Sequence, residues 1–179
     1  RMESELNTVG LPLPEKNVAA STLRCTFGKL EIELDVPEGV WNPTPNGILL
    51  GELLESMDFS SESILELGTG CGVHAVVLGL RGAREMLLTD IDEEILSHAK
   101  HNLDKHGINT KTRFLVADWV QVDVSGYDTL IANPPYGKDW NADKTEVEAE
   151  HALGKAGRFA PGLPRKSDGQ TLFLLHMLA

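Results

Sequence analysis

The sequence predicts an α/β fold with a doubly wound parallel sheet, helices on both faces of that sheet, and a β-hairpin on its N-terminal side. Two observations support this prediction. Short apolar runs alternate with helical patterns at the spacing of βαβ units, whose strands are parallel. Several of these runs also end on an acidic residue, an asparagine or a glycine-rich turn, as strands do at a ligand-binding edge.

The N-terminal part of the chain is expected to hold an irregular arm followed by the hairpin. Residues 1–22 are polar and weakly patterned. Residues 23–36 predict two short strands, because charged and apolar side chains alternate along 29–34. The connection that follows is rich in proline and glycine, and either Thr44 or Asn46 can cap the next helix.

The remaining elements form the predicted sheet and its helices. Each strand is a short, mostly apolar run bounded by turn-forming residues, and each helix is read from apolar positions at helical spacing. The strands are expected over residues 64–67, 86–90, 112–116 and 127–132, and the helices over 48–57, 73–80, 92–105, 143–151 and 170–179. Residues 154–169 are expected to form a loop.

We interpret residues 1–22 as an arm and residues 23–179 as one domain. A chain of 179 residues is long enough to bury roughly 70% of the surface that it exposes when unfolded.

Charge excludes a protein that binds nucleic acid over a broad surface. The chain has 16 basic and 27 acidic side chains, a net charge of −11, and residues 1–136 carry the whole excess. Residues 154–166 differ, because they hold four basic side chains and no acid. These side chains can contact phosphates, although a solvated loop is the alternative. They are Lys155, Arg158, Arg165 and Lys166.

Other compositional features point to an ordinary cytoplasmic protein. No apolar run approaches the ~18 residues of a membrane helix, and the N-terminal residues do not show a secretory signal. Cys25 and Cys71 make neither a disulfide framework nor a zinc site. We therefore expect a cytoplasmic location, no membrane association and no metal site.

A glycine-rich segment directly follows one expected strand and opens the next expected helix. It runs Glu66-Leu67-Gly68-Thr69-Gly70-Cys71-Gly72. Glycine in this context lets a ligand approach the backbone, and a helix N-terminus favours a phosphate or a carboxylate. The spacing differs from the dinucleotide-binding fingerprint, because the third glycine comes one residue early. A tight turn that binds no ligand is the alternative.

Acidic residues follow the next two strands. Asp90 lies 24 residues after Glu66, where a carboxylate can accept hydrogen bonds from both hydroxyls of a ribose. Asp118 follows the third strand and can accept a hydrogen bond from an adenine amine. Each acid taken alone is typical of a helix cap or a turn. Together, at one edge of a parallel sheet, they favour a ligand site.

The most specific motif is Asn133-Pro134-Pro135-Tyr136, which follows the fourth strand. Its two prolines remove two backbone donors and fix φ, so the nearby carbonyls are held rigidly. The Asn133 side-chain oxygen and a backbone carbonyl can then accept from one NH₂ group, which directs the lone pair of that nitrogen at an electrophile. Tyr136 can stack on a planar substrate. A purely structural turn is the alternative.

These motifs together resemble those of the class I S-adenosylmethionine-dependent methyltransferases of the Asn-Pro-Pro-Tyr type, which are Rossmann-like enzymes. The resemblance implies that S-adenosylmethionine is the cofactor and that Asp90 binds its ribose, Ile91 packs on its adenine and Asp118 reaches the adenine amine. The residues that would line the methionine portion are Glu66, Gly68, Thr69, Gly70 and Gly72. The catalytic residues that would hold the acceptor nitrogen are Asn133, Pro134, Pro135 and Tyr136.

The two parts of the chain resemble different members of this class. Residues 23–136, which include Val40-Trp41-x-Pro43, resemble the glutamine-N5 protein methyltransferases that act on release factors. That family does not usually carry the pattern that begins with Gly157-Arg158-Phe159 and ends with His176-Met177. Residues 132–179 resemble the adenine-N6 DNA methylase subunit of type I restriction-modification systems, whose glycine motif usually reads Asp-Pro-x-Cys-Gly-x-Gly instead. The second resemblance is denser in unusual residues, so it carries more weight per position.

The leading interpretation is therefore a methyltransferase that acts on the N6 amine of adenine in DNA, with a specificity or activator subunit as a partner. The four basic residues of 154–166 would then contact phosphates beside a flipped base. N5-methylation of a glutamine side chain in a protein such as a release factor is the alternative. The resemblance also implies further C-terminal strands after the last expected helix, so we interpret the domain as truncated: a fragment, a composite, or half of an association that supplies the missing edge. A third interpretation, from another class, is an inactive cofactor-binding partner module, because the sheet is then incomplete.

Overall fold

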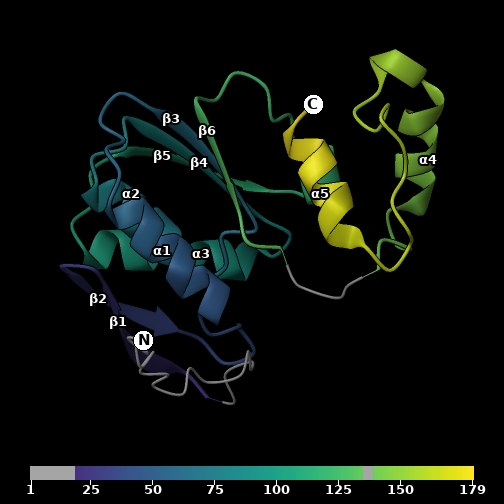
Figure 1. Cartoon of the computed structure of the whole chain (residues 1–179). Coiled ribbons are helices and arrows are strands. Elements are labelled where there is room, and N and C mark those ends of the chain that lie inside the picture. The colour runs from purple at the N-terminus through teal and green to yellow at the C-terminus, as the bar shows by residue number, and fades with distance from the viewer. Residues whose placement is uncertain (1–18, 135–138) are drawn as a thin grey trace, which may run out of the picture.

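The computed structural model describes residues 19–134 and 139–179, which form an α/β domain with a β-hairpin packed beside it (Figure 1). The hairpin pairs β1 (Ser21–Phe27) with β2 (Leu30–Val36) in antiparallel register. Phe27, Ile32 and Leu34 are buried, as the alternating pattern predicts. β1 begins inside the segment assigned to the arm, and residues 1–18 of that arm lie outside the described part of the chain.

The central sheet has four parallel strands within the described residues. They are β3 (Ser63–Leu67), β4 (Glu85–Asp90), β5 (Lys111–Val116) and β6 (Thr129–Ala132), in the order β5-β4-β3-β6. The chain therefore moves outward from β3 to β5 and then returns to the other side of β3. This return gives the doubly wound arrangement that the sequence predicts, with a switch point between β3 and β6.

Both faces of the sheet are covered, because alternate residues of its strands enter two different cores. One core holds Ile64 and Leu88 together with side chains of the hairpin and of α1 (Pro45–Glu55), α2 (Val73–Leu80) and α3 (Glu93–Lys105). The other core holds Leu65 and Leu87, and α5 (Gly169–Met177) covers it. Helices on both faces are thus confirmed, as Figure 1 shows.

The C-terminal part forms a smaller core beside the sheet. α4 (Lys144–Ala152) packs there through Val147 against Trp140 and Phe159. Two 3₁₀ helices, η1 (Trp119–Gln121) and η2 (Gly154–Ala156), are not predicted by the sequence patterns. η1 joins this core to the sheet, because the Trp119 and Phe173 rings stack with centroids 4.5 Å apart.

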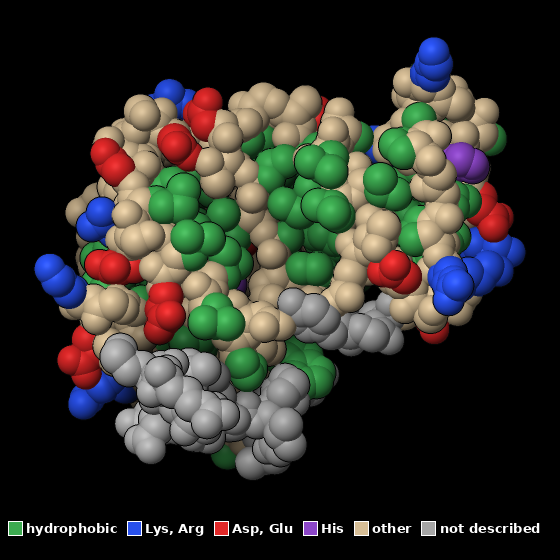
Figure 2. Space-filling model, in the orientation of Figure 1, with side chains coloured by type: hydrophobic (Ala, Val, Ile, Leu, Met, Phe, Trp, Pro, Cys, Tyr) green, Lys and Arg blue, Asp and Glu red, His purple; other side chains and the backbone are tan. Residues whose placement is uncertain are grey.

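The surface carries apolar side chains on the face that Figure 2 shows, over α1 and beside α5. On α1, Leu49 and Leu53 are exposed one helical turn apart, and Met57, which follows the helix, is also exposed. In the part of the chain that the structure describes, no helix is both long and apolar enough to span a bilayer.

Candidate functional site

The glycine turn, residues 68–72, joins β3 to α2 as predicted. Gly68 and Gly70 have φ values of 70° and 56°, a region that glycine adopts without strain. A Cβ added at either position would meet no other atom within 4 Å. Local packing therefore does not require glycine at these two positions, and the open space beside their backbone is where a ligand can approach.

Glu66 supports this turn from inside the protein. Its side chain is 1% exposed, and its Oε2 accepts a 2.7 Å hydrogen bond from Thr69 Oγ1. Its Oε1 lies 3.0 Å from His74 Nδ1. Both carboxylate oxygens are thus engaged with the protein, so Glu66 shapes the turn, and its direct contact with a ligand stays a prediction.

Asp90, at the end of β4, is hydrogen-bonded to the same turn. Its Oδ2 accepts a 3.1 Å hydrogen bond from Gly70 N, and its backbone carbonyl accepts from Ala117 N at 3.0 Å. The ends of β3, β4 and β5 therefore meet at one edge. Ile91 follows with 70% of its surface exposed, so its apolar side chain is free to contact a flat ligand.

Asp118 follows β5 at this edge and caps η1. Its Oδ1 accepts from Val120 N at 3.4 Å. Asp143, which precedes α4, lies close enough for its titration to be affected: burial raises the pKa of Asp143, and the negative charge of Asp118 raises it further. The two acids thus interact electrostatically near the end of β5.

Asn133 follows β6, and the start of α1 holds its side chain. Nδ2 donates a 3.2 Å hydrogen bond to Thr44 Oγ1, and Thr44 also caps α1 by accepting from Gly47 N at 3.1 Å. Because the amide nitrogen is bound to Thr44, Oδ1 is directed away from it. Among the described residues, no hydrogen bond to Oδ1 is found. Pro134 comes next, while Pro135 and Tyr136 lie outside the described residues.

Gly47 allows these elements to come together. A Cβ at Gly47 would lie 3.1 Å from Asn133 Nδ2 and 3.6 Å from His74 Nε2. His74 itself is 4% exposed, and its Nε2 lies 3.0 Å from the Gly47 carbonyl oxygen. The glycine turn, α1 and the end of β6 are therefore joined by one polar network.

Sequence reasoning identified Thr44 only as a helix cap and missed His74. A signal for His74 was present, because it is the only polar residue in an otherwise apolar segment, Val73–Leu80. A buried ionisable group needs a partner of opposite charge, and Glu66 in the preceding buried strand is such a group. The contact between Thr44 and Asn133 had no comparable signal, since 89 positions separate the two residues.

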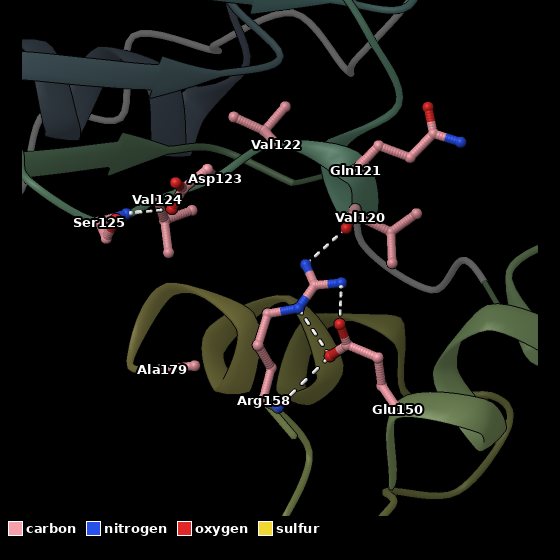
Figure 3. Close-up of a pocket in the computed structure, with 9 residues that line it drawn as sticks. All are labelled: Val120, Gln121, Val122, Asp123, Val124, Ser125, Glu150, Arg158 and Ala179. Carbon is pink, nitrogen blue, oxygen red and sulfur yellow. Dashed lines mark hydrogen bonds and ion pairs between the residues drawn. The ribbon is translucent and has the colours of Figure 1, made fainter. Parts of the chain in front are cut away.

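The basic residues of 154–166 do not form one DNA-binding surface, which corrects the prediction for Arg158. Its Nε and Nη2 donate to the Glu150 carboxylate at 2.7 and 2.8 Å, and Nη1 contacts the Val120 carbonyl and lies 2.7 Å from His176 Nδ1. Figure 3 shows the guanidinium turned toward Glu150 and Val120 beside a cavity of about 360 Å³. All three nitrogens are occupied, so Arg158 is a structural residue.

The other three basic side chains are exposed but separated. Lys155 lies in η2, just beyond the C-terminal end of α4. Arg165 and Lys166 are bound through their carbonyl oxygens to the indole and backbone N–H of Trp140, which precedes α4. α4 lies between the two groups, and basic side chains appear at both ends of the α4 region in Figure 2.

Two further observations limit the chemistry of the site. Among residues 19–134 and 139–179, no group of three or more His, Cys, Asp or Glu side chains is placed to hold a metal ion. Cys71, in the glycine turn, is buried, and burial raises the pKa of its thiol to about 12. It is therefore neutral at ordinary pH and unsuited to act as a nucleophile.

Comparison with known proteins identifies the family. The family model described as the methyltransferase small domain matches residues 47–160, more than half of the chain. The chain belongs to the methyltransferase small domain family. The matched range includes the glycine turn, Asp90, Asp118 and Asn133, but not Thr44.

Relatives of this methyltransferase domain differ in the substrates that their names give. The release factor glutamine methyltransferase of Chlorobaculum tepidum is 41% identical over 103 residues, which cover 52% of this chain and 34% of that protein. The tRNA1(Val) (adenine(37)-N6)-methyltransferase of Pasteurella multocida is 28% identical over 149 residues, which cover 71% of this chain and 62% of that protein. The chain thus spans less than two thirds of the length of either relative.

A solved structure supports the fold of the domain. The tRNA (uracil-54, C5)-methyltransferase of Pyrococcus abyssi, in complex with S-adenosyl-L-homocysteine, has a TM-score of 0.51 at 21% identity. The match covers 64% of this chain and 28% of that chain. At this identity the likeness shows the Rossmann-like fold alone.

Proposed function

We propose that this domain is the catalytic part of an S-adenosylmethionine-dependent N-methyltransferase that methylates the side-chain amide of a glutamine in a protein. The observation that carries the proposal is the hydrogen bonding of the Asn133 side-chain amide. Its nitrogen is fixed by Thr44 while its oxygen is left to accept from an incoming NH₂ group. The same sheet edge holds the glycine turn and Asp90.

The residues at the strand ends fit the proposed cofactor. The open space beside Gly68 and Gly70 admits a ligand against the backbone. The Asp90 carboxylate has acceptor positions left after its hydrogen bond with Gly70 N, so it can bind ribose hydroxyls. The exposed Ile91 offers apolar surface to an adenine. When bound there, S-adenosylmethionine supplies a methyl group activated by its sulfonium charge.

The chain's own groups supply the alignment that such a transfer needs. Asn133 Oδ1 accepts a hydrogen bond from the acceptor nitrogen, which turns the lone pair of that nitrogen toward the cofactor side of the edge. The same oxygen dipole stabilises the nitrogen as it becomes positive. Holding the reactants in line converts a bimolecular step into an effectively unimolecular one, which accounts for most of the expected acceleration.

The charge around this edge favours a protein substrate over DNA. Asp92, Glu93 and Glu94 surround the start of α3 next to Asp90. Asp118 follows the next strand, and its negative charge acts on Asp143. Nucleic-acid affinity comes mainly from phosphates neutralised by Lys and Arg, so this acidic edge opposes a polyanion and suits a basic protein surface. The 41%-identical relative named as a release factor glutamine methyltransferase supports the same substrate.

Adenine-N6 methylation of nucleic acid is the second candidate. An amide and an exocyclic amine present a similar NH₂ group to Asn133, and the relative from Pasteurella multocida is named for adenine-N6 transfer to tRNA. The exposed side chains of Arg165 and Lys166 would then contact phosphates. This candidate predicts binding that weakens steeply with salt.

Calorimetry and a parallel transfer assay test the proposal. We expect the chain to bind S-adenosylmethionine and Asp90→Ala to weaken that binding at least tenfold, since about 1.4 kcal/mol of ribose contact corresponds to that factor. Asp123→Ala, at an exposed acid away from the strand ends, is the matched control. Absence of binding by the wild-type chain would refute the methyltransferase proposal.

The substrate is identified by offering labelled cofactor with a protein that contains a Gly-Gly-Gln segment, with duplex DNA and with tRNA. Transfer to the glutamine protein alone supports the main proposal. Transfer to either nucleic acid, reduced by the double variant Arg165→Gln/Lys166→Gln, would replace it with the second candidate. Asn133→Ala should lower turnover on the true substrate far more than it lowers cofactor affinity.

A further inference from the structure

We propose that His74 is a positioning residue: as a buried imidazolium cation, it ties the start of α1 to the glycine turn and thereby holds Asn133 in place through Thr44. The catalytic consequence rests on the proposed function, whereas the charge state of His74 does not. His74 has no direct hydrogen bond to Asn133; it contacts Glu66, beside the expected cofactor site, and reaches Asn133 only through Gly47 and Thr44.

The two contacts of the His74 ring require both nitrogens to donate. Nδ1 lies 3.0 Å from Glu66 Oε1, and Nε2 lies 3.0 Å from the Gly47 carbonyl oxygen. A carboxylate and a peptide carbonyl are both acceptors, and a neutral imidazole carries only one N–H. Both hydrogen bonds form together only when the ring holds two protons. His74 is then a cation that neutralises the buried Glu66.

The surroundings of the ring favour this charge state. Burial disfavours the cation, but the hydrogen bond to Glu66, the charge of that carboxylate and the Gly47 carbonyl outweigh burial and raise the pKa of His74. Thr69 Oγ1 donates to the second oxygen of Glu66. Cys71, which also interacts with Glu66, stays neutral. Breaking a buried pair of this kind by removing one partner leaves an uncompensated charge.

Hydrogen bonds connect His74 to Asn133 through the first turn of α1. Gly47 accepts from His74 with its carbonyl oxygen and donates with its N–H to Thr44 Oγ1. Thr44 Oγ1 in turn accepts from Asn133 Nδ2. Loss of the His74 contact therefore frees the turn that orients the acceptor residue. A displacement of about 1 Å at such a site can cost roughly 100-fold in rate.

Nitrogen-15 NMR of the histidine rings tests the charge state without any substrate. At about pH 7.5 a histidine with the ordinary pKa of about 6.5 is mostly neutral, so a doubly protonated ring at that pH reports a raised pKa. We expect His74 to show two protonated ring nitrogens at that pH. A His74 ring with one unprotonated nitrogen would overturn the proposal, because the proton between Nδ1 and Glu66 would then reside on the Glu66 carboxyl group. This result stands whether or not the chain transfers a methyl group.

Steady-state kinetics tests the positioning role on the substrate found above. His74→Gln, which can keep only one of the two contacts at full strength, should lower kcat about tenfold or more while the Kd for S-adenosylmethionine changes less than about threefold. His98→Gln is the matched control and should change neither. Equal losses of kcat and cofactor affinity in His74→Gln would overturn the positioning role.

Two variants of Thr44 keep the test decisive if His74→Gln folds poorly. Thr44→Val removes the hydroxyl that accepts from Asn133 and should lower kcat by a similar factor. Thr44→Ser restores an accepting hydroxyl and should recover most of the rate. If the serine variant is as slow as the valine variant, Thr44 does not orient Asn133 and the proposal fails. A chain that transfers no methyl group refutes the proposed function, and the NMR result still decides the state of His74.

Discussion

Asn102 connects the hairpin, α3 and the glycine turn, and we expect Asn102→Ala to destabilise the domain by about 3 kcal/mol. Its side chain is completely buried. Oδ1 accepts from Asp35 N at 2.8 Å, while Nδ2 donates to the carbonyl oxygens of Asp35 and Cys71 at 3.0 and 2.8 Å. One carboxamide thus satisfies two backbone groups of β2 and one of the turn that carries the proposed cofactor site.

The magnitude follows from these three hydrogen bonds. Each contributes about 1 kcal/mol net, and the alanine variant leaves three backbone groups without that partner. For a domain of this size a loss of about 3 kcal/mol lowers the melting temperature by roughly 6–12 °C. Asn109→Ala is the matched control, because the exposed Asn109 side chain makes one 3.2 Å hydrogen bond to Gly107 O. It should cost less than about 0.5 kcal/mol.

Urea unfolding followed by tryptophan fluorescence and by circular dichroism measures this difference. A shift of the midpoint with an unchanged slope reports a change in stability alone. An Asn102→Ala variant within about 1 kcal/mol of the wild type, with the same slope, would refute the reasoning. The hairpin would then be held to the domain by its apolar contacts and not by this carboxamide.

Three other perturbations have clear expected outcomes. Hydrogen bonds, first of all the one from Lys105, lower the pKa of Asp35 to about 2. The ionised Asp35 therefore stabilises the fold fully above the pKa of about 3.9 that it has in the unfolded chain, and this stabilisation is lost as the pH falls toward 2. Asp35→Asn should flatten the unfolding free energy across that window, and a curve identical to wild type would contradict this. The Cys71 thiol should resist an aromatic disulfide reagent at about pH 8 until urea unfolds the chain; rapid labelling of the native protein would argue against its burial. Gly51→Ala should cost about 1–3 kcal/mol in thermal unfolding, because a Cβ there would lie 2.4 Å from the buried Phe27 ring, and wild-type stability would mean that this ring moves freely.

The elements of the fold were predictable because their signals are local. The range 73–80 is helical as expected, since an apolar run that follows a glycine turn has few other ways to satisfy its backbone. Thr44 caps α1, one of the two residues that the pattern allowed. Acids and an asparagine at successive strand ends predicted a shared edge, which parallel pairing confirms.

The interactions that hold the site together were not predictable in the same way. Asn102 looks like an ordinary polar residue on a helix, and its role depends on Asp35, 67 positions away. Arg158 was read from charge alone as a phosphate contact, but the structure pairs it with Glu150. Charge patterns give the sign of a side chain and not its partner, so internal ion pairs and surface contacts look the same in a sequence.

The two halves of the proposed site are joined through His74, but the residues that face the two ligands are held by hydrogen bonds of very different sequence separation. The cofactor half is built from neighbours in the βαβ unit, such as the Gly70 and Asp90 hydrogen bond across 20 positions. The acceptor half depends on Thr44, which precedes the range matched by the family model, and on Asn133 near the end of β6. Variants at Thr44 should therefore affect turnover while cofactor binding persists.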